Sequence, residues 1–338
     1  MSELVSRLSS FWIESQGERR DVLQSLAALI AILLLAIAIS PSAYDGSRIF
    51  LEIGNLTDIL RQVSIIGIIS LGMTFVILTG GIDLSVGSIL ALSTSLIAMI
   101  LTRWNSHFGF PLTVCSAMLL TVLATTSVGV VTGAVISALD VQPFVVTLAG
   151  MIGIRGLAKW LSNNANIDIG FSHDAASRFA EIFRAKAVTI ACYLGLALLF
   201  GFLLSRTVFG RYVRAIGDNE RAARYAGLPI RRTKIAVYAL SGLLSGVAGI
   251  LYAAENHQGN PNAGIAYELD AIAAVVIGGT RLSGGRGTIA GTIIGTLMVG
   301  VLTNILRLNN VDSNVEMMVK AIIIVLAVAV QRQAKFAR

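Results

Sequence analysis

Charged side chains are scarce in this sequence: Asp, Glu, Lys and Arg make up 13% of its 338 residues, whereas 55% are apolar. The apolar residues come in runs long enough to cross a bilayer, rather than in the stripes of a soluble amphipathic helix. We therefore expect an all-α polytopic membrane protein. The first run, 22–40, is too long for the apolar core of a secretory signal and has a poor cleavage site, so it is predicted to remain as the first span.

Proline is also rare, and its five positions support the division into spans. An interior proline removes a hydrogen bond from a helix and clashes with the preceding turn. All five prolines fall in predicted loops or at span edges. We predict ten spans, at 22–40, 59–79, 86–102, 112–138, 144–161, 187–205, 235–254, 269–280, 288–306 and 315–331. Of these, 269–280 is short for a full crossing.

The basic residues are unevenly distributed, which predicts the orientation in the membrane. With a cytosolic N-terminus, the cytosolic segments hold 16 of the 26 Lys and Arg residues. These segments are 1–21, 80–85, 139–143, 206–234, 281–287 and 331–338. Both termini are then cytosolic, as an N-terminal segment 1–21 and a basic tail 332–338 around a single transmembrane domain, 22–331. Anionic headgroups account for the net charge of +7, so we expect membrane lipid and no nucleic acid as a partner.

Cysteine and histidine are too few to suggest chemistry. Cys115 and Cys192 lie in apolar spans, and His107, His173 and His257 are scattered over predicted external loops. None has a partner at the spacing of metal ligands or of a nucleophile and its base. We therefore expect no catalytic residue, no metal site and no cofactor bound by this chain.

A phosphate-binding loop is missing as well. The nearest match, 279–286, lacks the Gly-Lys-Ser/Thr ending that holds phosphate and magnesium. If the protein uses ATP, another chain must hydrolyse it.

The segment 206–234 is the longest basic stretch of an otherwise apolar chain. Within it, Asp218 or Asn219 can cap a helix of about two turns, which a glycine ends. Glu220 and Arg224 can pair at i,i+4, and three alanines share a face that lets another surface come close. We predict an exposed cytosolic helix made of Asp218, Asn219, Glu220, Arg221, Ala222, Ala223, Arg224, Ala226 and Gly227.

Paired glycines mark two similar turns. In the turn 79–87 they precede an acid and a serine between apolar flanks, which permits a broken helix whose backbone faces a cavity. Asp83 would then contact a polar solute; in the alternative, Asp83 and Ser85 cap the third span. Residues 80–85 align without gaps to 278–283, which indicates either a parallel repeat or chance use of common turn chemistry.

Charges and glycines inside the predicted spans have competing interpretations. Glu268 and Asp270 begin an inward-going span, so they either rim an external cavity or cap the helix in solvent. Arg155 and Lys159 are expected to snorkel to headgroups. Glycines at small-xxx-small spacing are expected to bring helices close within one chain or across a dimer. They are Gly242, Gly246, Gly287, Gly291 and Gly295.

Over about residues 20–331, the chain resembles the transmembrane permease subunit of bacterial ABC importers for monosaccharides. The ribose type, within the branched-chain amino acid and sugar permease superfamily, is the most similar. Four stretches carry the resemblance: LGMTFVILTGGIDLSVGSILALS (71–93), VQPFVVTLAGMIGIRG (141–156), GRYVRAIGDNERAARYAGL (210–228) and YELDAIAAVVIGGTRLSGGRGTIAGTIIGTL (267–297). The presence of all four stretches in this order is a specific sign of the family, whereas each stretch alone is less specific.

The resemblance implies a complex in the bacterial inner membrane. Its parts would be two permease copies, identical or not, two cytosolic ABC ATPase subunits that bind ATP and magnesium, and a periplasmic sugar-binding protein. It also implies that the helix at 218–227 is the coupling helix, which docks into a groove of the ATPase.

The expected cargo is a monosaccharide, either a ribose-like pentose or a hexose. The residues expected to line its pathway are Thr79, Asp83, Gln142 and Glu268. An ion-coupled secondary sugar transporter with Asp83 as its membrane acid is the alternative, and uptake driven by an ion gradient without an ATPase would favour it. A structural membrane scaffold is a third possibility, favoured if no ATPase copurifies.

Overall fold

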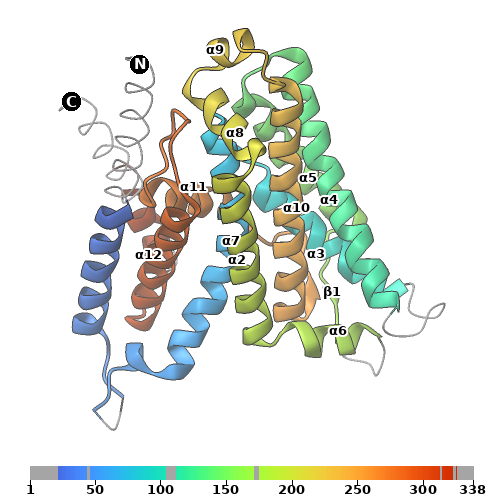
Figure 1. Cartoon of the computed structure of the whole chain (residues 1–338). Helices are drawn as coiled ribbons and strands as arrows, with labels where there is room; N and C mark the ends of the chain where they lie inside the picture. Colours follow the sequence, from blue (N-terminus) through green and yellow to red (C-terminus); the bar gives the residue numbers. More distant parts are fainter. Residues whose placement is uncertain are drawn as a thin grey trace.

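The protein is a bundle of helices (Figure 1). The computed structural model describes residues 22–43, 46–103, 112–170, 175–312, 314–322 and 325. A short antiparallel pairing joins β1 (Ile167–Asp168) to β2 (Gln258–Gly259). Helix α9 lies at one end of the bundle, and α6 lies at the opposite end.

The helices differ in length. They are the helix Val22–Ile39, η1 (Ile49–Leu51), α2 (Ile53–Leu78), α3 (Val86–Arg103), α4 (Leu112–Leu139), α5 (Pro143–Leu161), α6 (Ala175–Phe183), α7 (Lys186–Arg206), α8 (Val208–Asp218), α9 (Glu220–Tyr225), α10 (Ile230–Asn256), α11 (Tyr267–Ile277), α12 (Ile289–Leu308) and a helical stretch at 314–322. In the described part of the chain, seven of them are long and apolar enough to cross a membrane. This is a polytopic, all-helical membrane protein.

Most predicted span boundaries lie within two residues of a helix end. The largest differences are at α2, which begins at 53 instead of 59, and at α10, which begins at 230 instead of 235. Both extensions carry polar residues such as Thr57 and Arg231, which hydropathy assigns to loops. Length and apolar composition thus locate the helices, but polar end turns are missed.

The count of ten crossings and the side of the termini remain predictions. Helix α11 has 11 residues and is about 16 Å long, which is too short to cross a hydrocarbon core of about 30 Å alone. Of the predicted span 315–331, the structure describes only 315–322 and 325. The predicted tails 1–21 and 332–338 lie outside the described residues.

Helix α2 runs through the middle of the bundle. Every residue from Val63 to Leu78 is buried, which is the pattern of a helix surrounded by protein on all sides. Near its end, the ring of Phe75 lies 5.8 Å from that of Phe200 on α7 and 6.0 Å from that of Phe209 on α8. The end of α2 is thus held by the segment that leads to α9.

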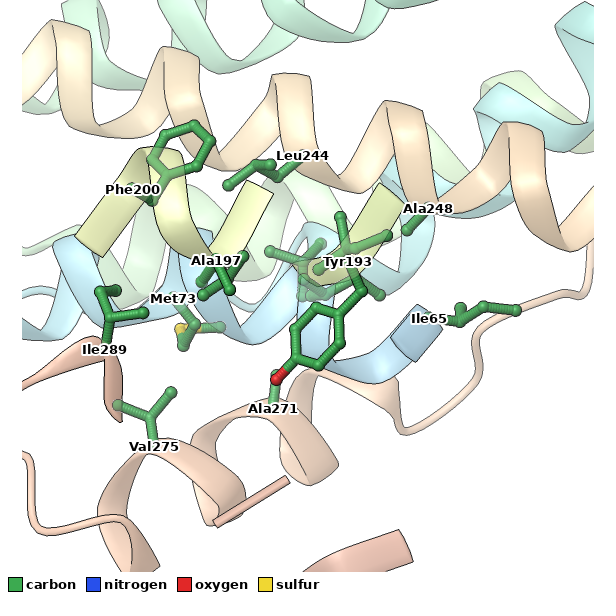
Figure 2. Packing of buried hydrophobic residues seen from close by; sticks show 14 of the residues in the cluster. Ile65, Met73, Tyr193, Ala197, Phe200, Leu244, Ala248, Ala271, Val275 and Ile289 are labelled. Atoms are coloured by element: carbon green, nitrogen blue, oxygen red, sulfur yellow. The ribbon is translucent and has the colours of Figure 1, made fainter. Parts of the chain in front are cut away.

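The core around α2 is apolar with a few satisfied hydroxyl groups. Tyr193 of α7 and Val275 of α11 belong to one buried cluster (Figure 2). The Tyr193 hydroxyl lies 3.0 Å from Thr296 Oγ1, and Thr74 Oγ1 lies 2.7 Å from Thr292 Oγ1. Because buried hydroxyl groups without partners are costly, these pairs fix the register of α12 against α2 and α7.

The glycines at small-xxx-small spacing pack within this chain. A β-carbon at Gly242 or Gly246 of α10 would collide with Thr125 of α4, and one at Gly295 of α12 would collide with the Ala274 carbonyl. Close backbone approach without a side chain is the usual role of glycine between membrane helices. Of the two interpretations, packing within one chain is the one that the structure supports for these glycines.

Candidate functional site

Between α10 and α11 the chain follows α3 through the bundle without forming a helix. The amide of Asn260 donates to Thr94 Oγ1 (3.1 Å), which itself donates to the Asn260 carbonyl (2.9 Å). A β-carbon at Gly264 would meet the Gly87 carbonyl at 2.9 Å, so the chain continues to the first turn of α3. Non-helical backbone at membrane depth occurs only where protein buries it or where it lines a water-filled cavity.

Arg155 of α5 points to this segment. Its Nη1 donates to the carbonyl oxygens of Ala263 (2.5 Å) and Pro261 (3.2 Å). The expected snorkelling to headgroups is therefore wrong for Arg155: unpaired backbone carbonyls inside the bundle attract the guanidinium.

Glu268 lies close to the first turn of α3. A β-carbon at Gly87 would meet Glu268 Oε2 at 2.6 Å, so a side chain at position 87 would fill the space of the carboxylate. Oε2 is buried and has no hydrogen-bond partner in the described part of the chain, although Arg155 is near enough to attract it. Glu268 lies in the first turn of α11, which begins at Tyr267, so the rim of an external cavity and a helix cap both remain predictions for it. Asp270 instead pairs with Lys320 (3.1 Å).

Asp83, four residues before Gly87, is fully hydrogen-bonded. Its Oδ1 accepts from the Ser85 amide (2.9 Å) and the Ser85 hydroxyl (2.6 Å), and its Oδ2 accepts from Ser241 Oγ of α10 (2.7 Å). The carboxylate is 1% exposed. These bonds match the cap alternative and also tie the start of α3 to α10; a role in the pathway remains a prediction.

The two glycine turns share one backbone geometry. At the end of α2, Gly80 has φ +77° and the Gly81 amide donates to the Val76 carbonyl; at the end of α11, Gly279 has φ +94° and the Thr280 amide donates to the Val275 carbonyl. This is the six-to-one bond of a Schellman motif. Gly80 is therefore equivalent to Gly279, not to Gly278 as in the gapless alignment. Duplication as the origin of the likeness stays a prediction.

The first turn, and the loop 281–286 that follows the second turn, meet the end of α8. The Gly285 amide donates to the Leu78 carbonyl (2.9 Å), and a β-carbon at Gly217 would overlap both of these groups. A β-carbon at Gly284 would lie 3.0 Å from the Gly80 nitrogen and from Gly217 Cα. We call Leu78, Gly80, Gly217, Gly284 and Gly285 the glycine junction. Since backbone touches backbone there, the end of α8 cannot move without moving the first turn and this loop.

Helix α8, which connects the junction to α7, was not predicted. Thr207 caps it by accepting from the Gly210 amide (3.3 Å), and Val213 and Ile216 are buried. With Phe209, these residues have the i, i+4, i+7 spacing of an amphipathic helix, which was the available signal.

Helix α9 follows directly after the junction. Asn219 Oδ1 caps it by accepting from the Ala222 amide (3.0 Å), and Glu220 pairs with Arg224 (3.4 Å), as predicted. Lys234 of α10 adds a second pair with Glu220 (2.8 Å). The helix ends where Gly227 takes φ +75°, so it is shorter than the expected 218–227.

The faces of α9 differ from the expected alanine surface. Ala223 is buried against the chain, whereas Arg221, Ala222, Arg224 and Ala226 are exposed. The largest exposed side chain was missed by sequence reasoning: Tyr225 is 92% exposed. An aromatic ring in the middle of a basic stretch was the available signal.

Comparison with known proteins assigns the family. Residues 55–328 match the family described as branched-chain amino acid transport system, permease component. The chain belongs to this permease family. It is 40% identical to the ribose import permease protein RbsC of Escherichia coli (strain K12) over 313 residues, which cover 92% of this chain and 93% of the relative.

Two further relatives are similar over nearly the whole chain. RbsC of Bacillus subtilis (strain 168) is 41% identical over 321 residues, covering 92% of this permease and 94% of the relative. The xylose transport system permease protein XylH of Escherichia coli (strain K12) is 33% identical over 372 residues, covering 91% of each. No solved structure gives a significant match.

The four residues expected to line the pathway of this permease are only partly together. Thr79 and Asp83 share one turn, Thr79 being 8% exposed, and Glu268 lies beside the helix that follows this turn. Gln142 is exposed at the start of α5, where its side chain makes no cap hydrogen bond. Thr147 of α5 donates to the Ile82 carbonyl (3.1 Å), which links α5 to the same turn.

Proposed function

We propose that this permease forms the translocation pathway of an ATP-driven importer in the bacterial inner membrane. Its cargo would be a monosaccharide delivered by a periplasmic binding protein, as the names of the ribose and xylose relatives suggest. The observation that carries the proposal is the attachment of the exposed helix α9, through Gly217, to the end of α2 and to the loop that follows the second glycine turn.

In this mechanism, work enters from outside the chain. ATP and magnesium bind the partner ATPase, whose closure moves α9 and, through the glycine junction, the ends of α2 and α11. Two permease copies then alternate between inward-facing and outward-facing states, and ATP drives the cycle only through its different affinity for the two. The proposed ten crossings with cytosolic termini place α9 on the side of the ATPase.

The exposed side of α9 suits a protein partner. Tyr225 projects from a helix that Asn219 and Lys234 hold in place, and basic side chains surround it. Exposed aromatic rings presented by rigid elements are common anchors of interfaces, and arginines favour an acidic rim on the partner.

Replacing Tyr225 by alanine should weaken binding of the purified ATPase to the permease by about 30-fold, whereas Tyr225→Phe should stay within about threefold, because the ring supplies the contact. Titration of labelled ATPase into permease in nanodiscs measures both. Equal binding by the alanine variant and the unmodified permease would place the dock elsewhere.

Reconstituted uptake tests the function itself. Proteoliposomes that contain the permease and the ATPase, with ATP inside and the binding protein outside, should accumulate labelled ribose or xylose without an ion gradient. Uptake that follows a proton or sodium gradient in the absence of the ATPase would instead establish the ion-coupled alternative.

A further inference from the structure

We propose that Arg155, Glu268 and the non-helical segment 261–266 form a binding site for a neutral, hydroxyl-rich solute within the permease. The inference rests on the proposed function, since it places the cargo at one point of the pathway. It also gives Arg155 a role in the pathway that its sequence context did not suggest.

The position of the two charges argues against a lipid-facing surface. Arg155 is the thirteenth of the 19 residues of α5, a helix long and apolar enough to cross the membrane. Both Arg155 and Glu268 are half-buried, so part of each side chain reaches the surface of this chain. Ionisable groups inside a membrane face protein or water-filled space, because exposure to hydrocarbon is too costly. The two charges therefore favour polar space over lipid beside them.

The same two residues have complementary hydrogen-bonding capacity for a solute. Glu268 Oε2 is buried beside Gly87 without a described partner, so a hydroxyl group reaches this acceptor once the half-buried side chain turns toward the surface. Arg155 uses Nη1 for the carbonyls of Pro261 and Ala263, and the guanidinium carries further N–H donors on Nη2 and Nε. A donor beside an acceptor matches neighbouring hydroxyl groups of a sugar. One positive and one negative charge balance, so a neutral solute is favoured over an ion.

Exposed apolar side chains lie on the segment that Arg155 contacts and on the helix that carries Glu268. Ile265 on the non-helical segment is 66% exposed, and Leu269 of α11 is 50% exposed. Sugars present C–H groups as well as hydroxyl groups, and sites for small ligands combine apolar walls with a few placed polar groups. The local composition thus fits a sugar better than it fits an inorganic ion.

Uptake of deoxy sugars tests the hydrogen bonds. In proteoliposomes driven by ATP, ribose is compared with its deoxy derivatives for the unmodified permease and for Glu268→Gln. For one deoxy derivative, the ratio of ribose uptake to deoxy-sugar uptake should be about tenfold higher in the unmodified permease than in Glu268→Gln. The reason is that a hydrogen bond from a hydroxyl group to a carboxylate is stronger than one to an amide. The ratio cancels the selectivity of the binding protein, which is the same in both assays.

A matched control is Asp58→Asn, which changes an acid to its amide at an exposed ion pair with Lys186. It should leave the ratio between ribose and each deoxy derivative unchanged. If Glu268→Gln also leaves every ratio unchanged while uptake remains ATP-driven, the site is wrong and the proposed function stands. If the unmodified permease shows no ATP-driven uptake, the proposed function itself fails.

Thiol accessibility tests the polar space without relying on transport. In a variant lacking Cys115 and Cys192, Ile265→Cys should react with a membrane-impermeant thiol reagent at least about tenfold faster than Leu198→Cys, which is 77% exposed on α7. Ribose at high concentration should slow the reaction at position 265. Equal, slow labelling at both positions would mean that 265 faces lipid and would overturn the proposal.

Discussion

Replacing Gly217 by alanine should strongly weaken the coupling between the ATPase and transport. The added methyl group would overlap the Leu78 carbonyl and the Gly285 amide, whose hydrogen bond joins the end of α2 to the loop 281–286. Because all neighbouring atoms are backbone, the strain cannot be relieved by a change of rotamer, and a cost of about 2–4 kcal/mol is expected. We expect the rate of ATP-driven uptake to fall by a factor of about 10 or more. Uptake and sugar-stimulated ATPase activity, measured in the same proteoliposomes, check this.

Gly195→Ala is the matched control. Gly195 also lies inside a helix, α7, but an added β-carbon there meets nothing within 4 Å. Alanine is the better helix former by about 1 kcal/mol, so stability should be equal or slightly higher and uptake unchanged. Normal coupling in the Gly217→Ala variant would show that the junction does not carry the movement of α9.

Replacing Asp83 by leucine should strongly reduce the amount of folded permease. The carboxylate is the acceptor for the Ser85 amide, the Ser85 hydroxyl and Ser241 Oγ, all in a buried environment. Leaving such donors without an acceptor is expected to cost about 2–4 kcal/mol. Thermal unfolding in detergent, followed by loss of the monodisperse peak on a sizing column, measures the effect.

Asp83→Asn separates a cap from an ion carrier. The amide oxygen can still accept from Ser85, and its NH₂ can donate to Ser241, so stability should stay within about 1 kcal/mol and ATP-driven uptake should persist. An ion-coupled transporter that depends on the charge of Asp83 would lose uptake in this variant. Unchanged stability of Asp83→Leu would refute the capping role.

The helices of this permease could be predicted because the signals are local. Hydropathy predicted a span at 112–138, and α4 occupies 112–139. Capping chemistry located α9 through Asn219, Glu220 and Gly227. Helix α8 was missed because Arg211, Arg214 and two glycines interrupt its apolar residues within a basic stretch. The alignment of the two glycine turns was shifted by one residue, since either glycine of a pair can take the left-handed position and only the backbone decides which.

The sequence by itself determined that the chain crosses the membrane repeatedly, where most helices begin and end, and that a capped helix lies within the basic stretch. Hydropathy and capping act within a few residues. The tertiary structure decided which distant residues meet: Gly217 with Leu78 and Gly285, and Arg155 with Ala263. These contacts join residues far apart in the chain, and they depend on backbone approach and on carbonyls exposed by an interrupted helix. No local pattern encodes such contacts, which is why Arg155 looked like a headgroup contact until the fold placed it beside Glu268.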